Sequence, residues 1–484
     1  MEQRYIAAIE IGSSKVSCAV GILDNNDTLS VIAIEEENFI DSVRYGCIKN
    51  LDDVYNHVKS VISKIENRSG IAPRQLKGVY VGIGGRSVSL KAKEISENFN
   101  EDIEITEQII TRLKNSVDCS QLPDKYELIS LEPREFIVDN AISQKPVGTV
   151  GNHLKIIFNE ISGKALIKNN LNRVFSERLQ LPVYNYILRP TAQANMVLTT
   201  DEKHLGCMLV DFGAETTTVA IYKADALQYL ATIPLGSRNI TRDLTSLNIT
   251  ETRAEELKIK EGTVAQQDKS QYQDPIDGFD SNEMSDYINA RASEIIANIH
   301  EQINFANLKT ADLPGGIIII GNGAKLRGFN AMLESQSGMQ VRMGAPLPHI
   351  RIADASIRPF DAIDVISILA AASQLPERDS CFMLPIEPEQ VELFREEDDE
   401  EDDDDNEEDE NIYNEEDEYL EDEEEEIFIV QKPQKEEKKE KKREPKPEVP
   451  KKPGFFTRKA TILKDKIANL LSENEEEDDE EESK

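Results

Sequence analysis

Residues 9–15 read IEIGSSK and residues 210–217 read VDFGAETT. Each segment lies between two strand-like runs, so each predicts a hairpin in which a glycine turn follows an acidic residue, Glu10 or Asp211. The order of strand, acidic residue, glycine turn and strand thus occurs twice in one chain. An internal duplication explains this repetition and predicts two related α/β halves.

A third glycine turn, Gly321-Asn322-Gly323, follows the apolar run 316–320 and precedes a helix that we predict at 328–336. Turns of this kind point consecutive backbone N–H groups into one concavity, which favours an anion such as phosphate. Glycine also lets a backbone approach a ligand closely. One such turn alone is usually an ordinary hairpin or loop. Three of them, each after a strand in a duplicated chain, predict a nucleotide site. Glu10 and Asp211 stand at strand ends, where their carboxylates can hold a hydrated Mg²⁺.

Periodicity predicts the other elements. Strand-like runs occupy Arg4–Ile11, 16–23, 29–34, 77–83, 184–188, 207–210, 216–222, 227–233 and 316–320, and helical spacing marks 51–67, 164–180, 191–199, 250–262, 283–308 and 361–373. Residues 86–162 differ, because three short strand-like runs (87–92, 136–138 and 154–158) accompany one predicted helix at 103–117. We interpret this stretch as a small α+β insertion.

The composition excludes several classes of function. The chain has 484 residues and a formal net charge of −37, most of it in two acidic runs, 396–426 and 473–482. These runs would repel phosphate backbones, so we expect no nucleic-acid partner. The five cysteines form no C-x-x-C pair and the five histidines no H-E-x-x-H motif, so thiolate zinc sites and zinc hydrolases are not indicated.

The start of the chain and its apolar runs bear on membranes. Met1 to Arg4 lead straight into a predicted strand, which leaves no room for a signal peptide. No apolar run approaches the roughly 18 residues of a spanning helix. We therefore expect any contact with a membrane to be peripheral.

Residues 455–471, FFTRKATILKDKIANLL, are the candidate for that contact. At helical spacing their apolar side chains share one face and the cations lie largely elsewhere, which is typical of a helix lying in a lipid interface. The predicted membrane-binding residues are Phe455, Phe456, Arg458, Lys459, Leu463, Lys464, Ile467, Leu470 and Leu471. A helix that binds a protein partner is the alternative. Burying the apolar face gives roughly 5–10 kcal/mol before the cost of folding, so one copy would bind weakly and assembly would raise avidity.

The motifs resemble those of a known superfamily. IEIGSSK (9–15), VDFGAETT (210–217) and IIGNGAKLRG (319–328) resemble the ATPase superfamily of actin, heat-shock chaperones and sugar kinases. Within it, the FtsA family of bacterial cell-division proteins is the most similar. PLGSRNITRDL (234–244), AEELKIKEG (254–262), RASEI (291–295) and KPVG (145–148) extend that resemblance. It implies an actin-like (ribonuclease H-like) α/β fold of two duplicated lobes, with a small α+β insertion subdomain. Beyond about residue 390 the chain is too charged to bury a core, so we expect a disordered C-terminal tail.

The resemblance also suggests boundaries. The first lobe would comprise 1–83, 163–198 and 358–390, with the insertion at 84–162. The second lobe would comprise a core, 199–230 plus 309–357, and a helical and strand subdomain, 231–308. A disordered linker (391–453), the amphipathic helix (454–472) and an acidic tail (473–484) would follow. The acidic part of the linker reads as an extended spacer, or as a competitor of lipid for the basic helix.

Site residues follow in part from the turns and in part from the resemblance. The predicted nucleotide-binding residues are Gly12, Ser13, Ser14, Lys15, Asp211, Gly213, Thr216, Thr217, Gly236, Glu255, Lys258, Gly321, Asn322 and Gly323, with Glu10 and Asp211 for Mg²⁺. By resemblance, Glu255 and Lys258 would hold the ribose of ATP, and Arg291 and Glu294 would hold the C-terminal tail of the tubulin-like division protein FtsZ. From spacing alone, each pair reads as a surface ion pair on a helix.

The resemblance implies a filament-forming, ATP-binding adaptor. It would assemble on the cytoplasmic face of the bacterial inner membrane at midcell, tether FtsZ there for septum formation, and recruit other division proteins through the insertion. Glu10 stands where this family usually has Asp, and no general base stands out, so we expect slow ATP hydrolysis at most. The alternatives are a small-molecule kinase of the same fold and an actin-like adaptor of pilus assembly.

Overall fold

The computed structural model describes residues 4–24, 28–119, 121–264, 281–348, 350–375 and 380–383. All of them belong to one compact unit, Met1–Pro385. The predicted linker, amphipathic helix and acidic tail lie outside the described residues. Within the described part, no helix combines the length and the apolar character that crossing a membrane requires.

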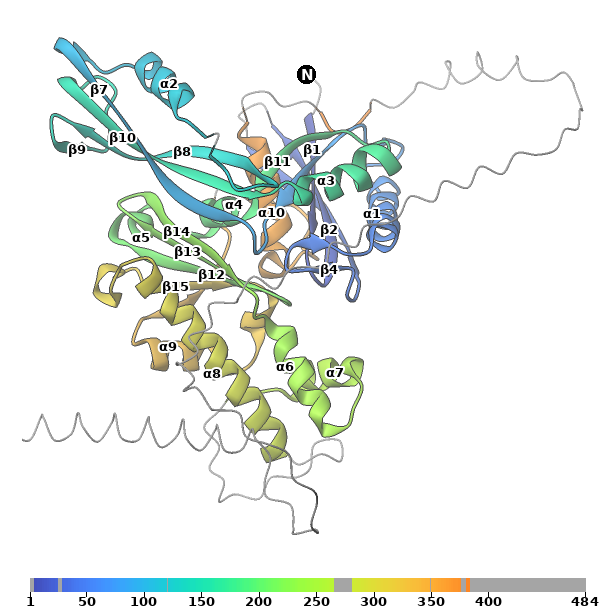
Figure 1. Cartoon of the computed structure of the whole chain (residues 1–484). Helices are drawn as coiled ribbons and strands as arrows, with labels where there is room; N and C mark the ends of the chain where they lie inside the picture. Colours follow the sequence, from blue (N-terminus) through green and yellow to red (C-terminus); the bar gives the residue numbers. More distant parts are fainter. Residues whose placement is uncertain are drawn as a thin grey trace, which may run out of the picture. The chain divides into compact units, whose positions relative to one another are not determined.

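The first sheet has six strands, in the order β11-β6-β1-β2-β3-β17. Figure 1 labels β1, β2 and β11 of this sheet. Its strands are β1 (Arg4–Ile11), β2 (Lys15–Leu23), β3 (Leu29–Asn38), β6 (Val79–Ile83), β11 (Val183–Leu188) and β17 (Arg351–Ile352). Helices α10 (Ile363–Ser373) and α1 (Leu51–Glu66) pack on it, α10 against β1 and β2 and α1 against β2 and β3. The near-continuous burial of β1 and β2 follows from this cover.

The second sheet repeats this plan. Its order is β14-β13-β12-β15-β16, with β12 (Cys207–Phe212), β13 (Thr217–Lys223), β14 (Ala226–Ile233), β15 (Ile317–Ile320) and β16 (Val341–Met343). β12, β13 and β14 form an antiparallel meander, as β1, β2 and β3 do. β15 then pairs parallel with β12, and β16 with β15, as β6 pairs with β1 and β11 with β6. The predicted duplication is confirmed strand by strand.

Helices of the second half cover this sheet and continue beyond it. The long helix α8 (Ser281–Phe305) packs on β13 and against α9 (Phe329–Ser337), and α6 (Ser237–Leu244) packs between α8 and α7 (Glu251–Glu261). The sequence patterns predicted α7, α8 and α9, whereas α6 has no apolar run long enough to mark it. Short elements complete the described chain: β4 (Val43–Arg44), β5 (Cys47–Ile48) and 3₁₀ turns at Thr245–Leu247, Thr310–Asp312, Asn322–Lys325 and Pro359–Ala362.

The insertion is a four-stranded sheet in the order β7-β10-β8-β9, with helix α2 (Glu107–Ser116). Its strands, β7 (Ser89–Glu104), β8 (Tyr126–Val138), β9 (Ala141–Ser143) and β10 (Val150–Lys164), are much longer than the predicted runs. The prediction of a helix over 103–117 was wrong at its start. Residues 103 and 104 still pair with β10, and the helix begins after Thr106, whose hydroxyl accepts from the N–H of Ile109.

Two other predicted helices differ from the structure in their extent or type. Instead of one helix over 164–180, α3 (Leu166–Asn172) continues into a π-helical segment, Arg173–Arg178. The helix predicted over 191–199 is α4 (Arg189–Val197), two residues earlier at each end, and a short helix that was not predicted, α5 (Thr200–Leu205), follows it. A capping box starts this second helix, because Thr199 and Glu202 satisfy each other's backbone N–H groups.

Candidate functional site

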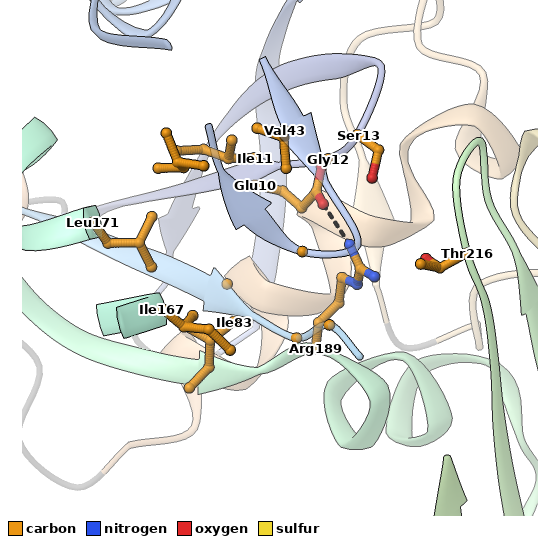
Figure 2. A pocket seen from close by; sticks show the side chains of 15 residues that line it. Glu10, Ile11, Gly12, Ser13, Val43, Ile83, Ile167, Leu171, Arg189 and Thr216 are labelled. Atoms are coloured by element: carbon orange, nitrogen blue, oxygen red, sulfur yellow. Dashed lines mark hydrogen bonds and ion pairs between the residues drawn. The ribbon is translucent and has the colours of Figure 1, made fainter. Parts of the chain in front are cut away.

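A hollow lies where parallel strands β1 and β6 end. Figure 2 shows it, with Gly12 and Ser13 of the first glycine turn at one wall and Thr216 of the second turn at another. Gly82 to Gly85, at the end of β6, form a further wall, and Ile167 and Leu171 of α3 close the apolar side. The two glycine turns predicted from sequence therefore meet at one hollow.

The two turns have the same internal geometry. The N–H of Gly12 donates to the carbonyl of Lys15 over 2.9 Å, and the N–H of Gly213 donates to the carbonyl of Thr216, also over 2.9 Å. Both turns thus close on themselves in the same way at the end of equivalent strands. The side chains between, Ser13 and Ser14 in the first turn, stay at least partly exposed. Such a turn offers hydroxyls and backbone donors to an anion.

The third glycine turn lies directly on the end of β12. Gly321 has a φ of +86°, and a Cβ there would come within 2.5 Å of the Phe212 carbonyl and 2.7 Å of Asp211 Oδ1. A Cβ at Gly323 would meet the ring of Phe212 at 2.7 Å. Any side chain would clash at these two positions. Glycine is therefore required there for the backbone of the turn to lie close to Asp211. Gly321, Asn322 and Gly323 do not line the hollow described above.

A buried cluster of charges joins the two lobes at this place. The Arg189 guanidinium donates from Nη1 to Glu10 Oε1 over 2.6 Å, and its Nη2 lies 3.6 Å from Asp211 Oδ2. The amide of Gln193 donates to Asp211 over 3.0 Å and to Asp364 over 2.6 Å. Three carboxylates therefore surround a single guanidinium and one amide.

The pKa values reflect this burial. Burial raises the pKa of Glu10 to about 7, although Arg189 acts in the opposite direction. Burial and the charge of Asp364 raise the pKa of Asp211 to about 6. Burial alone would lower the pKa of Arg189, but Glu10 and Asp211 hold it above its ordinary value, so Arg189 remains charged.

The residues predicted to hold Mg²⁺ do come together, but around an arginine. Glu10 and Asp211 each direct a carboxylate oxygen at the Arg189 guanidinium. Elsewhere in the described part of the chain, no group of three or more His, Cys, Asp or Glu side chains is arranged to hold a metal. This donor set does not fit Mg²⁺, because the guanidinium of Arg189 already lies between the carboxylates of Glu10 and Asp211.

The side chain of Lys15 faces other partners. Its Nζ donates to Glu36 Oε2 over 2.8 Å and to the carbonyl of Asp361 over 2.9 Å. Its role in binding nucleotide stays a prediction, and the ammonium would have to leave Glu36 to fulfil it. Thr217 is likewise engaged, because its hydroxyl donates to the carbonyl of Leu235.

Glu255 and Lys258 meet on one face of α7, as their spacing predicts. The buried Nζ of Lys258 donates to Glu255 Oε2 over 2.7 Å, and also to α6 at the hydroxyl of Thr241 and the carbonyl of Ser237. Gly236 lets α6 begin against the second turn, since a Cβ there would lie 2.2 Å from the carbonyl of Ala214. The ribose-binding role of this pair stays a prediction.

Arg291 and Glu294 lie on α8 and pair over 2.6 Å. Arg291 also holds Asp243 of α6 through two hydrogen bonds, of 2.6 Å and 2.9 Å, so it is half of a bridge between two helices. Glu294 is the more exposed partner. The nine residues predicted to bind a membrane lie outside the described residues.

Arg189, Gln193, Asp364 and the glycines at 84 and 85 were missed by the sequence reasoning. The Arg189-Pro190 pair marks the start of a helix, and Pro190 indeed stands in its first turn. Nothing in the local sequence marks Arg189 as a partner of Glu10, because 179 positions separate them.

Comparison with known proteins agrees with these features. The family model described as "Cell division protein FtsA" matches residues 208–359, and the model described as "SHS2 domain inserted in FTSA" matches residues 85–162. The cell division protein FtsA of Porphyromonas gingivalis is 28% identical over 341 residues, which cover 69% of this chain and 71% of the relative. FtsA of Streptococcus pneumoniae is 29% identical over 385 residues, or 77% of this chain and 81% of the relative.

Among solved structures, a chain of a PilM–PilN type IV pilus biogenesis complex superposes with a TM-score of 0.56 at 13% identity. The match covers 77% of this chain and 99% of that one. At this low sequence identity, the structural similarity shows a shared fold and says nothing about function. Together with the duplicated sheets, it establishes the expected actin-like fold with an inserted α+β domain. One family model describes the inserted domain of FtsA, the other matches residues 208–359, and the FtsA relatives align over 69% and 77% of this chain. The chain belongs to the FtsA family of cell division proteins.

Proposed function

We propose that this chain is an ATP-binding, actin-like division protein that assembles into filaments on the cytoplasmic face of the membrane and links FtsZ to it at midcell. The observation that carries the ATP site is the hollow in which both glycine turns meet (Figure 2). The hollow is lined by Ser13 and Thr216, which carry hydroxyls, and by the backbone of Gly84 and Gly85. Backbone donors of this kind suit the phosphates of a nucleotide.

The adenosine end of the ligand would lie toward α6 and α7. The second turn is hydrogen-bonded to the start of α6, through Ser237 N–H to the Gly213 carbonyl and Arg238 N–H to the Ala214 carbonyl. Lys258 and Glu255 stand behind that helix. A nucleotide whose phosphates contact the second turn would thus have a path to the predicted ribose partners.

The link to FtsZ would use the exposed side of α8. Glu294 presents a carboxylate to solvent, while Arg291 is held in place by Asp243. We propose that this charged pair binds the C-terminal tail of FtsZ. Other division proteins would bind the inserted domain, whose long strands β7 and β10 extend away from the two duplicated sheets (Figure 1).

The decisive test is sedimentation of the full chain with anionic vesicles, with and without ATP. We expect the chain to sediment with vesicles, and more of it when ATP is present, because assembly multiplies a weak anchor. A truncation at residue 453 should remain in the supernatant in both conditions. If the truncated and full chains sediment equally with vesicles, residues 455–471 are not the membrane-binding segment.

A matched pair of variants on the full chain separates the anchor from its charge. Leu463→Asp places one charge on the predicted apolar face and should abolish vesicle binding. Asn469→Asp adds a charge outside the set of predicted contacts and should reduce binding far less. If both changes reduce binding alike, the helix binds by charge alone.

A further inference from the structure

The charge cluster at the hollow already contains a cation. Arg189 contributes it from the first residue of α4, directly after β11. Its Nη1 is 2.6 Å from Glu10, and its Nη2 is 3.6 Å from Asp211. These are the two carboxylates at the ends of the equivalent strands β1 and β12, where a bound divalent cation would find its ligands.

The arginine is fixed where it is. Pro190 stands in the first turn of α4, and β11 pairs with β6 up to Leu188, so the backbone on both sides of Arg189 is held. A metal ion entering between Glu10 and Asp211 would have to displace a permanently charged group from both carboxylates. Removing one partner from a buried ion pair is strongly unfavourable.

One donor of Arg189 is still unused. Its Nε–H is buried and has no hydrogen-bond partner among the described residues. The side chain lines the hollow between Glu10 and Thr216 (Figure 2). Gly84 stands beside it, and a Cβ at that position would lie 3.7 Å from Nε. Because residue 84 is glycine, no side chain from that position packs against this donor.

From this geometry we infer that Arg189 takes the place of the divalent cation, and that the chain binds the phosphates of its nucleotide without Mg²⁺, through the free Nε–H of Arg189. The inference rests on the proposed nucleotide site and adds how the negative charge there is balanced. The guanidinium neutralises Glu10 and Asp211 as a metal would, and it presents a charged donor to a phosphate oxygen.

The test is the affinity of the full chain for ATP, measured by calorimetry in Mg²⁺ buffer and in EDTA. We expect the dissociation constants to agree within about twofold, since the resident cation is part of the chain. Loss of binding in EDTA alone would overturn this inference and leave the proposed function standing. Absence of binding in both buffers would overturn both.

Variants give independent readouts. Arg189→Gln should weaken binding by about tenfold or more in EDTA, the loss of a charge-assisted hydrogen bond, and Mg²⁺ should restore part of it. Gly84→Ala places a methyl against Nε at an ordinary contact distance, so it should fold normally and also weaken binding in EDTA. Unchanged affinity in Gly84→Ala and in Arg189→Gln would overturn the role of Arg189.

The matched control is Arg68→Gln. Arg68 also bridges two carboxylates, Glu35 and Asp354, each at 2.7 Å, but it does not line the hollow. Its loss should lower stability without changing the affinity for ATP or the effect of EDTA. If ATP binding by Arg68→Gln depended on Mg²⁺, lower stability of the fold, and not the loss of the cation at the hollow, would explain such a dependence. That result would overturn the inference.

Discussion

The Arg189 guanidinium donates a 2.6 Å hydrogen bond to the carboxylate of Glu10, and so joins the start of α4 to the end of β1. Both side chains are largely buried. Removing the two partners should have unequal effects. Arg189→Gln leaves Glu10, Asp211 and Asp364 without their cation and should lower the free energy of unfolding by about 3–5 kcal/mol.

Glu10→Gln should be much milder. The glutamine keeps an oxygen that accepts from Arg189, and Asp211 and Asp364 still balance the guanidinium. Denaturant unfolding of the two variants measures the difference. Equal losses would mean that the charge of Glu10 matters as much as that of Arg189, and that Asp211 and Asp364 do not balance the guanidinium without it.

This pair also marks the limit of prediction from sequence. The glycine turns at 12 and 213 were predicted because each is local, with its strand, acidic residue and turn within a few positions. Their matching hydrogen bonds confirm that reasoning. The contact of Glu10 with Arg189 depends on β1, β6 and β11 pairing in one sheet, and only the assembled topology supplies that information.

The insertion shows a second limit. β7 has 16 residues, and charged and polar side chains dominate its later half. A search for apolar runs therefore does not detect that half as a strand. Its pairing with β10 stabilises it instead. Propensity then favoured a helix from residue 103 onward. In the structure, residues 103 and 104 are the last two of β7, and the helix begins only after its N-cap, Thr106.

Lys15→Met should affect stability and not ligand affinity. The Lys15 ammonium is held by Glu36 and by the carbonyl of Asp361, and so ties β2 to β3 and to the approach of α10. We expect a lower melting temperature and an unchanged dissociation constant for ATP. Thermal unfolding and calorimetry on the same preparation separate the two effects. A large loss of affinity with unchanged melting would assign Lys15 to the phosphates, as the motif suggests.

Glu294→Lys should reduce binding of a peptide from the FtsZ C-terminal tail by about tenfold or more, the effect of reversing one charge in a specific contact. Fluorescence anisotropy of the labelled peptide measures it. Glu283→Lys, an exposed glutamate on the same helix, is the matched control and should leave binding unchanged.

Replacement of Arg291 is a less specific test of the same site. Arg291 holds Asp243 through two hydrogen bonds, so Arg291→Ala should also loosen α6 from α8 and lower the melting temperature. If Glu283→Lys weakens peptide binding as much as Glu294→Lys does, the peptide recognises the charge of the whole helix and not this pair.

Glu37 should make stability depend on acid pH. Although partial burial acts against it, hydrogen bonds from Lys64, Ser60 and His57 lower the pKa of Glu37 to about 2, below its ordinary value of 4.5. A depressed carboxyl pKa stabilises the fold at pH values above the unfolded-state pKa, and this contribution is lost as the pH falls from 4.5 toward 2.

Glu37→Gln should therefore melt a few degrees below the parent chain at about pH 6, and the gap should shrink as the pH falls below about 4.5. Melting curves across that range measure the gap. Glu177→Gln replaces an exposed glutamate in the π-helical segment and should show no gap that varies with pH. A constant gap for Glu37→Gln would mean that neutral contacts, and not the ionised carboxylate, link α1 to β3, because only the ionised form is lost on acidification.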